Sequence, residues 1–302
     1  MAVFGSTDAK VLLPRTISDG MVKEAQSTST VAKLSGRTPQ RFGESDIIIF
    51  NDFPKAEFVD EGAEKSSTTG GFSSVTAKPR KAQVTMRFNE EVQWADEDYQ
   101  LGILSELAGA GQVALSRALD LGLYHRINPL TGTAISSWDN YLTSTTNIVD
   151  AGTGDADAQL RAAVGLLMQQ DHSWGVNGLA LDPRLSWALA ELTTADGTQR
   201  YPSLGFGANV EAFMGVNAAQ GNTVSGTPEA TDTGVRAIVG DFQSGIRWGV
   251  QREIPAEIIR WGDPDGQGDL KRKNQIALRL EIVFGWYVFA DRFAVVKETI
   301  GG

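Results

Sequence analysis

Residues 53–88 read FPKAEFVDEGAEKSSTTGGFSSVTAKPRKAQVTMRF, and the rest of the chain is best understood around this stretch. Towards its end, Ala82, Val84, Met86 and Phe88 alternate with polar residues, which is the two-residue period of a half-buried strand. Residues 62–77 are rich in Gly, Ser and Thr. Two strands joined by a long polar tip form a ribbon, and an isolated ribbon is only marginally stable in water. We therefore expect it to lie on another surface, one that belongs to other copies of the same chain.

The segments beside the ribbon predict a strand before it and a long helix after it. Residues 47–50 (IIIF) are the strand candidate. Residues 96–127 carry apolar side chains mostly three or four apart and are followed by Asn128-Pro129, which predicts a helix of roughly 48 Å at about 1.5 Å per residue. Four glycines lie inside it: Gly102, Gly109, Gly111 and Gly122. They permit either bending of the helix or close approach of a neighbour, and the sequence does not decide between the two.

Beyond a Ser/Thr/Gly-rich connection at residues 131–154, helices and strands alternate. We predict a helix over residues 156–170, a strand over 178–181 and a second helix from Asp182-Pro183 to residue 192, with Asp182 as its N-cap. Further strands are expected at 210–216 and 235–239. This alternation indicates one compact α/β domain.

The last third of the chain is rich in strands. Strands are expected at residues 245–250 and 257–261, followed by a long apolar strand at 278–296 that breaks near Asp291-Arg292. The final strand is too long for one small sheet. We expect it to pair with the ribbon beside the long helix.

Composition excludes several classes of protein. The 302-residue chain has a formal net charge of −10, which argues against a protein whose main task is to grip nucleic acid phosphates. It contains no cysteine, so disulfides and thiolate chemistry are excluded. Residues 1–20 lack the pattern of a signal peptide, and the apolar run at 282–290 is too short to span a bilayer, so we expect no targeting segment and no membrane partner.

The sequence offers little that resembles a reaction centre. His125 and His172 have no nucleophile or carboxylate at a recognisable spacing, so we expect capping or surface roles for both. Residues 263–269 (DPDGQGD) lack the regular ligand spacing of a calcium loop and are interpreted as a turn. Residues 205–207 lack the third glycine of a nucleotide loop. We therefore predict that the protein is not an enzyme and has no cofactor or metal.

The order of these segments resembles the major capsid proteins of tailed bacteriophages, which have the Hong Kong 97-type fold. Residues 56–62 (AEFVDEG) are similar to the ascending edge of that family's extended loop, and residues 81–88 to its descending edge. The 96–127 helix resembles its spine helix. Residues 177–183 (NGLALDP) are similar to its axial domain, and residues 240–242 with 277–297 to its C-terminal part.

The resemblance implies an α+β fold divided into five regions: an N-terminal arm (1–46), an extended β-ribbon loop (47–90), the spine helix of a peripheral domain (91–130), an axial α/β domain (131–245) and C-terminal strands shared between the peripheral and axial domains (246–302). It further implies a structural protein of the virion that assembles as hexamers and pentamers into an icosahedral shell around phage DNA, without sequence-specific binding. Because the matching region starts close to Met1, scaffolding is expected from a separate protein. The other expected partners are a portal protein and, as a further candidate, a decoration protein.

Contacts between copies are then the functional sites. The candidates are charged and aromatic residues of the loop and of two basic clusters, one at residues 78–81 and one at residues 271–273. They are Glu57, Phe58, Asp60, Glu61, Lys65, Phe72, Lys78, Arg80, Lys81, Arg87, Lys271, Arg272 and Lys273. In so acidic a chain, the basic clusters suit acidic surfaces of a neighbour better than phosphates, although a solvated patch is the alternative for each. Alternatives for the whole chain are an encapsulin-like bacterial compartment shell protein and a non-viral oligomeric binding protein.

Overall fold

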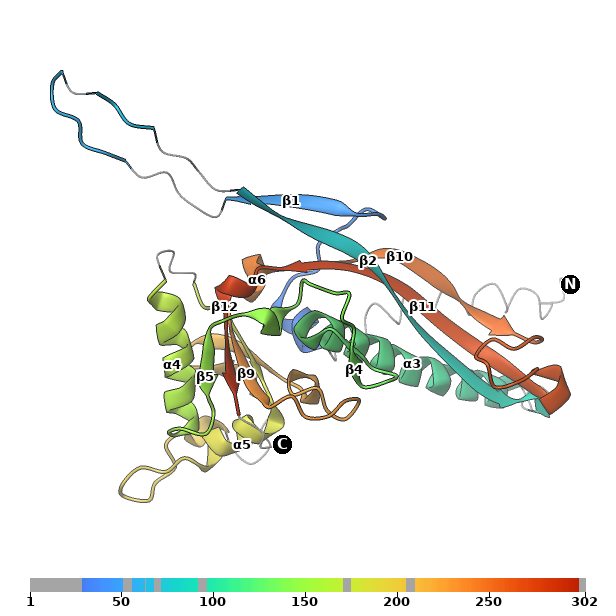
Figure 1. Cartoon of the computed structure of the whole chain (residues 1–302). Coiled ribbons are helices and arrows are strands. Elements are labelled where there is room, and N and C mark those ends of the chain that lie inside the picture. The colour runs from blue at the N-terminus through green and yellow to red at the C-terminus, as the bar shows by residue number, and fades with distance from the viewer. Residues whose placement is uncertain are drawn as a thin grey trace, which may run out of the picture.

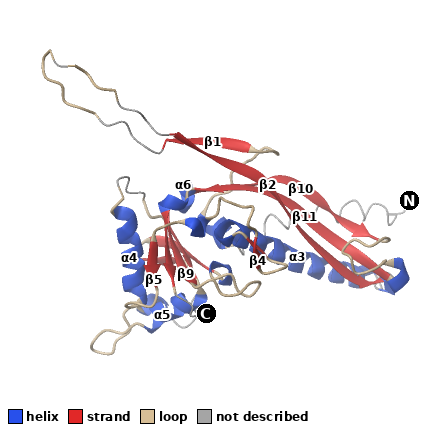
Figure 2. Ribbon diagram, in the orientation of Figure 1, coloured by secondary structure: helices blue, strands red, loops and turns tan. Residues whose placement is uncertain are grey.

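The computed structural model of the chain describes residues 29–50, 56–62, 64–67, 72–91, 97–170, 175–204 and 210–298. Its described part contains a long four-stranded sheet that runs beside helix α3 (Glu97–His125), and a smaller six-stranded sheet at one end of the molecule (Figure 1). The smaller sheet carries helices α4 (Ala156–Met168) and α5 (Pro183–Glu191). The loop between β1 and β2 projects away from both sheets (Figure 2). The fold is therefore a mixed α and β structure with one protruding arm.

The long sheet has the strand order β1-β2-β11-β10, and all its neighbours are antiparallel. Its strands are β1 (Ser45–Phe50), β2 (Phe72–Asn89), β10 (Ile246–Ile259) and β11 (Gln275–Val288). Met86 pairs with Leu278 and Val84 with Leu280, so the alternating face predicted for β2 lies beside the apolar face of β11. The predicted pairing of the ribbon with the C-terminal strand is confirmed.

Helix α3 (Glu97–His125) packs against the face of the long sheet that carries these apolar side chains. A Cβ atom added to Gly111 would lie 2.3 Å from Leu280 Cδ1, and one added to Gly122 would lie 3.0 Å from the Trp286 ring. Nothing lies within 4 Å of the same position at Gly109. The sequence left open whether the glycines permit bending of the helix or close approach of a neighbour. For Gly111 and Gly122, the structure shows close approach of the sheet.

The helix ends two residues before the predicted position. His125 is its last residue, and Arg126 follows in the left-handed conformation (φ 54°), with its backbone N–H bonded to the Gly122 carbonyl at 3.1 Å. This is the usual geometry just beyond a helix C-terminus, here without the usual glycine. The chain then enters the short strands β3 (Ile127–Asn128) and β4 (Thr133–Ala134).

The smaller sheet has the order β5-β12-β9-β6-β8-β7 and mixes parallel and antiparallel neighbours. Its strands are β5 (Ile148–Asp150), β6 (Gly178–Leu181), β7 (Ala212–Phe213), β8 (Val216–Gln220), β9 (Val235–Gly240) and β12 (Phe293–Lys297). The helices are α4 (Ala156–Met168) and α5 (Pro183–Glu191). Asp182 accepts a hydrogen bond from the Arg184 N–H at 2.9 Å, which confirms it as the N-cap of α5.

Two short connections between the sheets lie at neighbouring places. The short helix α6 (Phe242–Gly245) links β9 to β10, and a 3-10 turn (Ala290–Arg292) links β11 to β12. The rings of Phe242 and Phe293 meet edge to face here, with centroids 5.2 Å apart. The predicted break near Asp291-Arg292 is confirmed, and it is the point where the last strand changes sheet.

Three predicted elements differ in the structure. The strands expected at 245–250 and 257–261 are one strand, β10, whose register with β11 shifts twice, between Val250 and Arg252 and between Ile254 and Glu257. The strand expected at 210–216 is the hairpin of β7 and β8. Helix α2 (Thr30–Leu34) was not expected.

Candidate assembly surface

The described tip of the loop, residues 56–62 and 64–67, lies beyond the end of the β1–β2 pair (Figure 1). Every residue of these segments is exposed. Glu57 accepts hydrogen bonds from the backbone N–H of Ser66 at 2.9 Å and from the Ser66 hydroxyl, which ties the two sides of the tip together. These bonds lower the pKa of the Glu57 carboxyl. The chain reverses at Gly62, whose φ of 86° favours glycine.

The tip combines an aromatic side chain with acidic ones. Phe58 is fully exposed, and Val59 beside it is 38 % exposed. Carboxylates surround them at Glu57, Asp60, Glu61 and Glu64, against one cation at Lys65. Apolar surface displayed in this way marks a site of interaction rather than a feature that stabilises the subunit.

Of the basic candidates on β2, Arg80 and Lys81 make contacts inside the subunit. The Arg80 guanidinium lies 4.1 Å from the centre of the Trp138 ring, a cation–π arrangement. Burial lowers the pKa of Arg80. Lys81 forms an ion pair with Glu281 at 2.8 Å. Lys78 lies on the same strand and is exposed, whereas Phe72 pairs through its backbone with Phe50 at the tip end of the strand.

Arg87 is engaged by the loop that the sequence singled out for its acidic residues. Its Nη2 lies 3.0 Å from Asp263 Oδ1, and its Nε lies 2.8 Å from Asp265 Oδ2. The hydrogen bond to Asp265 raises the pKa of Arg87, and the same bond lowers that of the carboxyl. The loop between β10 and β11 is therefore a turn, as predicted, and its acidic groups hold a guanidinium of the same chain.

The second basic cluster, Lys271 to Lys273, is also partly engaged. Lys271 pairs with Glu90 at 2.6 Å, and Lys273 Nζ donates to the Gln267 carbonyl at 2.5 Å. The backbone N–H of Arg272 donates a hydrogen bond to Asp269 Oδ1 at 3.0 Å. These bonds fasten the far end of the long sheet to itself.

The capping or surface role predicted for His125 is wrong. Its side chain is buried, and its Nε2 lies 2.9 Å from the Val224 carbonyl oxygen. Burial lowers its pKa to about 4, so the imidazole is neutral near pH 7 and does not complement the helix dipole with a charge. His172 and residues 205–207 lie outside the described residues.

A buried polar cluster that the sequence did not reveal anchors the N-terminal arm to α3. The carboxylate of Asp120 accepts hydrogen bonds from the Ser29 hydroxyl, from the backbone N–H groups of Thr30 and Val31, and from the hydroxyls of Thr30 and Thr223. Burial raises the pKa of this carboxyl, and the hydrogen bonds from Ser29, Thr223 and Thr30 act in the opposite direction. Ser29 is also the N-cap of α2, so one serine both starts the helix and fastens it.

The described residues contain neither a candidate metal site nor a helix that could span a membrane. Among the described residues, no group of three or more His, Asp or Glu side chains is arranged to hold a metal ion. In the same residues, no helix has both the length and the apolar character needed to cross a membrane.

Comparison with known proteins decides the family. The sequence model of the Phage capsid family matches residues 9–297. The chain belongs to the phage capsid family. The solved structure from Mycobacterium phage Ogopogo is 44 % identical to this capsid protein with a TM-score of 0.82, and the match covers 90 % of this chain and 92 % of that one. The structure from Gordonia phage Cozz is 29 % identical with a TM-score of 0.76, covering 91 % and 87 %.

More distant structures share the fold. The capsid of a native GTA particle is 13 % identical with a TM-score of 0.60, and the match covers 92 % of this chain and 91 % of that one. No curated protein matches the sequence. The resemblance and the α+β fold predicted from the sequence are confirmed. The protein is a major capsid protein, a structural component of the virion shell.

Proposed function

We propose that this capsid protein assembles as hexamers and pentamers into an icosahedral head shell that encloses phage genomic DNA. Membership of the family supports the shell. The net charge of −10 supports enclosure of DNA without tight or sequence-specific binding. Assembly takes place in the host cytoplasm, together with a separate scaffolding protein, a portal protein and a candidate decoration protein, as the family resemblance implies.

We also propose the five-region division implied by the resemblance, with residues 131–245 as the axial domain. Two observations support it. Residues 131–245 supply all strands of the smaller sheet except β12, and residues 246–302 supply strands to both sheets. The C-terminal region is then shared between the peripheral and axial domains.

The observation that carries the proposal is the exposed tip. It displays Phe58 among carboxylates, and all its described residues are exposed, so burial of this surface is expected from another molecule. We propose that the loop lies over an adjacent subunit and that Glu57, Phe58, Asp60, Glu61 and Lys65 make the main contact. Phe72 and Lys78 lie further along the same arm.

The remaining candidates are proposed to act less directly. Arg80, Lys81, Arg87 and Lys271 already have partners inside the subunit, and so does Lys273. An acidic neighbour would compete with those partners for the same cation. Arg272 is exposed and has a side chain that could meet an acidic surface more directly.

The test is to replace residues 57–66 by a flexible Gly/Ser segment of equal length and to follow assembly by electron microscopy. Because the tip does not pack on the sheets, we expect the circular dichroism spectrum and thermal midpoint of the subunit to be unchanged while the yield of closed shells falls sharply. Normal shells from this variant would refute the role of the tip. Absence of shells from the unmodified protein under all conditions would refute assembly by this chain alone.

A further inference from the structure

A segment of the N-terminal arm lies directly on the outer face of the long sheet. We call residues 37–43 the strap. The backbone N–H of Thr38 donates to the Trp248 carbonyl at 2.8 Å, and the backbone of Arg37 forms an isolated parallel β-bridge with Trp248. Gly249 and Gly285 face each other in the β10–β11 pair beneath the strap. A Cβ on Gly249 would lie 2.1 Å from the Thr38 carbonyl oxygen, so only glycine admits this approach.

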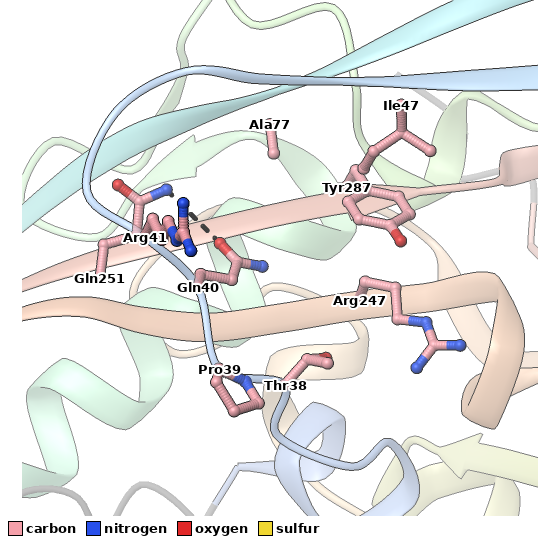
Figure 3. Close-up of a pocket in the computed structure, with 9 residues that line it drawn as sticks. All are labelled: Thr38, Pro39, Gln40, Arg41, Ile47, Ala77, Arg247, Gln251 and Tyr287. Atoms are coloured by element: carbon pink, nitrogen blue, oxygen red, sulfur yellow. Dashed lines mark hydrogen bonds between the residues drawn. The ribbon is translucent and has the colours of Figure 1, made fainter.

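Beside the strap lies a cavity of about 420 Å³, shown in Figure 3. It is bounded by the strap, the start of β1, β2, β10 and β11. Volumes of roughly 300–1,000 Å³ are typical of sites that bind small groups. Such a cavity is large enough to receive a few side chains of another polypeptide.

The lining of the cavity combines two cations with an apolar wall. Arg41 comes from the strap and Arg247 from β10, while Ile47, Ala77 and Tyr287 provide apolar and aromatic surface. Figure 3 shows the Tyr287 ring near Ile47, with Arg247 on the neighbouring strand. None of the described lining side chains is acidic.

Gln251, one of the uncharged polar residues in the lining, forms hydrogen bonds with the strap. Its Nε2 donates to the Gly43 carbonyl at 3.3 Å and lies 3.4 Å from Gln40 Oε1, and its Oε1 accepts from the Gly43 N–H at 3.3 Å. Gln251 therefore holds the strap in place over the cavity. The charged groups of the lining are the guanidinium groups of Arg41 and Arg247, and the Arg247 side chain also forms a hydrogen bond with Tyr287.

A ligand for this lining carries anionic groups next to an apolar or aromatic one. The exposed tip of the loop has that chemistry, with Phe58 between Glu57 and Asp60 and with Glu61 following. We propose that the cavity beside the strap receives the acidic tip of the loop from a second copy of this chain. This inference rests on the proposed association of copies and names the receiving surface.

The tip of the same chain is an unsuitable occupant. Ile47 of β1 and Ala77 of β2 belong to the cavity wall, and the paired strands lead from there to the loop. The described tip begins at residue 56, beyond the end of β1 at Phe50. Figure 1 shows that the loop continues away from the sheet.

Charge exchange tests the proposal in shells. The pocket variant Arg41→Glu/Arg247→Glu and the tip variant Asp60→Arg/Glu61→Arg should each lower shell yield about tenfold or more, because like charges then meet across the contact. Combining both sets should recover most of the yield. Arg252→Glu is the matched control, since it changes an exposed arginine of the same strand that does not line the cavity.

Peptide binding tests the cavity without shells. A peptide of residues 56–67 (AEFVDEGAEKSS) should bind the full-length protein, and binding should weaken about tenfold or more in the pocket variant but not in Arg252→Glu. Circular dichroism and melting curves verify that the variants are folded, and Arg247→Gln replaces the double variant if it is not. Equal peptide binding by wild type and a folded pocket variant would overturn the pocket while leaving shell formation intact. Shell failure of the wild type would instead count against the proposed function.

Discussion

Replacing Gly111 by alanine should destabilise the subunit more than replacing Gly109, although both lie inside α3. Alanine is the better helix former by up to about 1 kcal/mol at either position. At Gly109 nothing lies within 4 Å of the new Cβ, so this gain is retained. At Gly111 the Cβ would lie 2.3 Å from Leu280 Cδ1 and 3.2 Å from Met86 Cε.

The clash of an added Cβ at Gly111 with Leu280 can be relieved only at a cost in packing energy. Leu280 is fully buried between α3 and its neighbours in the sheet, so its side chain can move only by displacing others. Overpacking of this kind costs about 1–3 kcal/mol. Since the helix-propensity gain is common to both variants, G111A should be less stable than G109A by about 1–3 kcal/mol.

The assay is urea unfolding of the unassembled subunits, with the midpoints and slopes of wild type, G109A and G111A compared in parallel. Equal slopes permit the midpoints to be read as differences in stability. If G111A proved as stable as G109A, the sheet would not approach the helix as closely as described, and the packing argument would fail.

Three further measurements probe other parts of the structure. Gly249→Ala should loosen the strap at a cost of about 1–3 kcal/mol, whereas Gly36→Ala, with nothing within 4 Å, should change stability by less than about 0.5 kcal/mol; melting curves and the rate of tryptic cleavage after Arg41 distinguish them. Burial lowers the pKa of His125 to about 4, whereas an unfolded histidine titrates near pH 6.5. The free energy of unfolding should therefore fall by roughly 3 kcal/mol as the pH is lowered from above 6.5 to 4. Melting curves of His125→Gln at the same pH values should not show this decrease. Burial alone would raise the pKa of Asp232, but hydrogen bonds from Arg236 and Arg184 lower it to about 2. The free energy of unfolding should therefore fall by roughly 2 kcal/mol between pH 3.8 and pH 2. Asp232→Asn should not show that decrease in melting curves.

The parts of the fold that follow from local pattern could be predicted from the sequence. The alternation at residues 82–88 predicts a strand with one apolar face, and such a face requires a partner with the same pattern, which β11 provides. Asp182-Pro183 specifies the start of α5 because an N-cap and a proline at the first helical position act locally. A protruding polar loop could be predicted for the same reason, but residues 72–77, expected to belong to its tip, form the start of β2 and pair with β1.

The features that depend on distant partners could not be predicted. Ser29 and Thr30 belong to a polar run that argues against a helix, yet α2 forms because Asp120, about ninety positions away, accepts their hydrogen bonds. His125 follows a pattern typical of a helix end, but tertiary packing buries it and keeps it neutral, with its Nε2 2.9 Å from the Val224 carbonyl oxygen. For Arg87, charge patterning indicates an acidic partner without deciding between its own chain and a neighbour.

The most direct test of the account is electron microscopy of the purified protein under conditions that favour association. A capsid protein whose function lies in contacts between copies should form closed shells, or rings of six and five subunits. Particles recovered from infected cells should contain nucleic acid rather than protein cargo. A small monomer that stays dispersed under all conditions would contradict the central claim, and shells filled with protein cargo would contradict the enclosure of phage DNA.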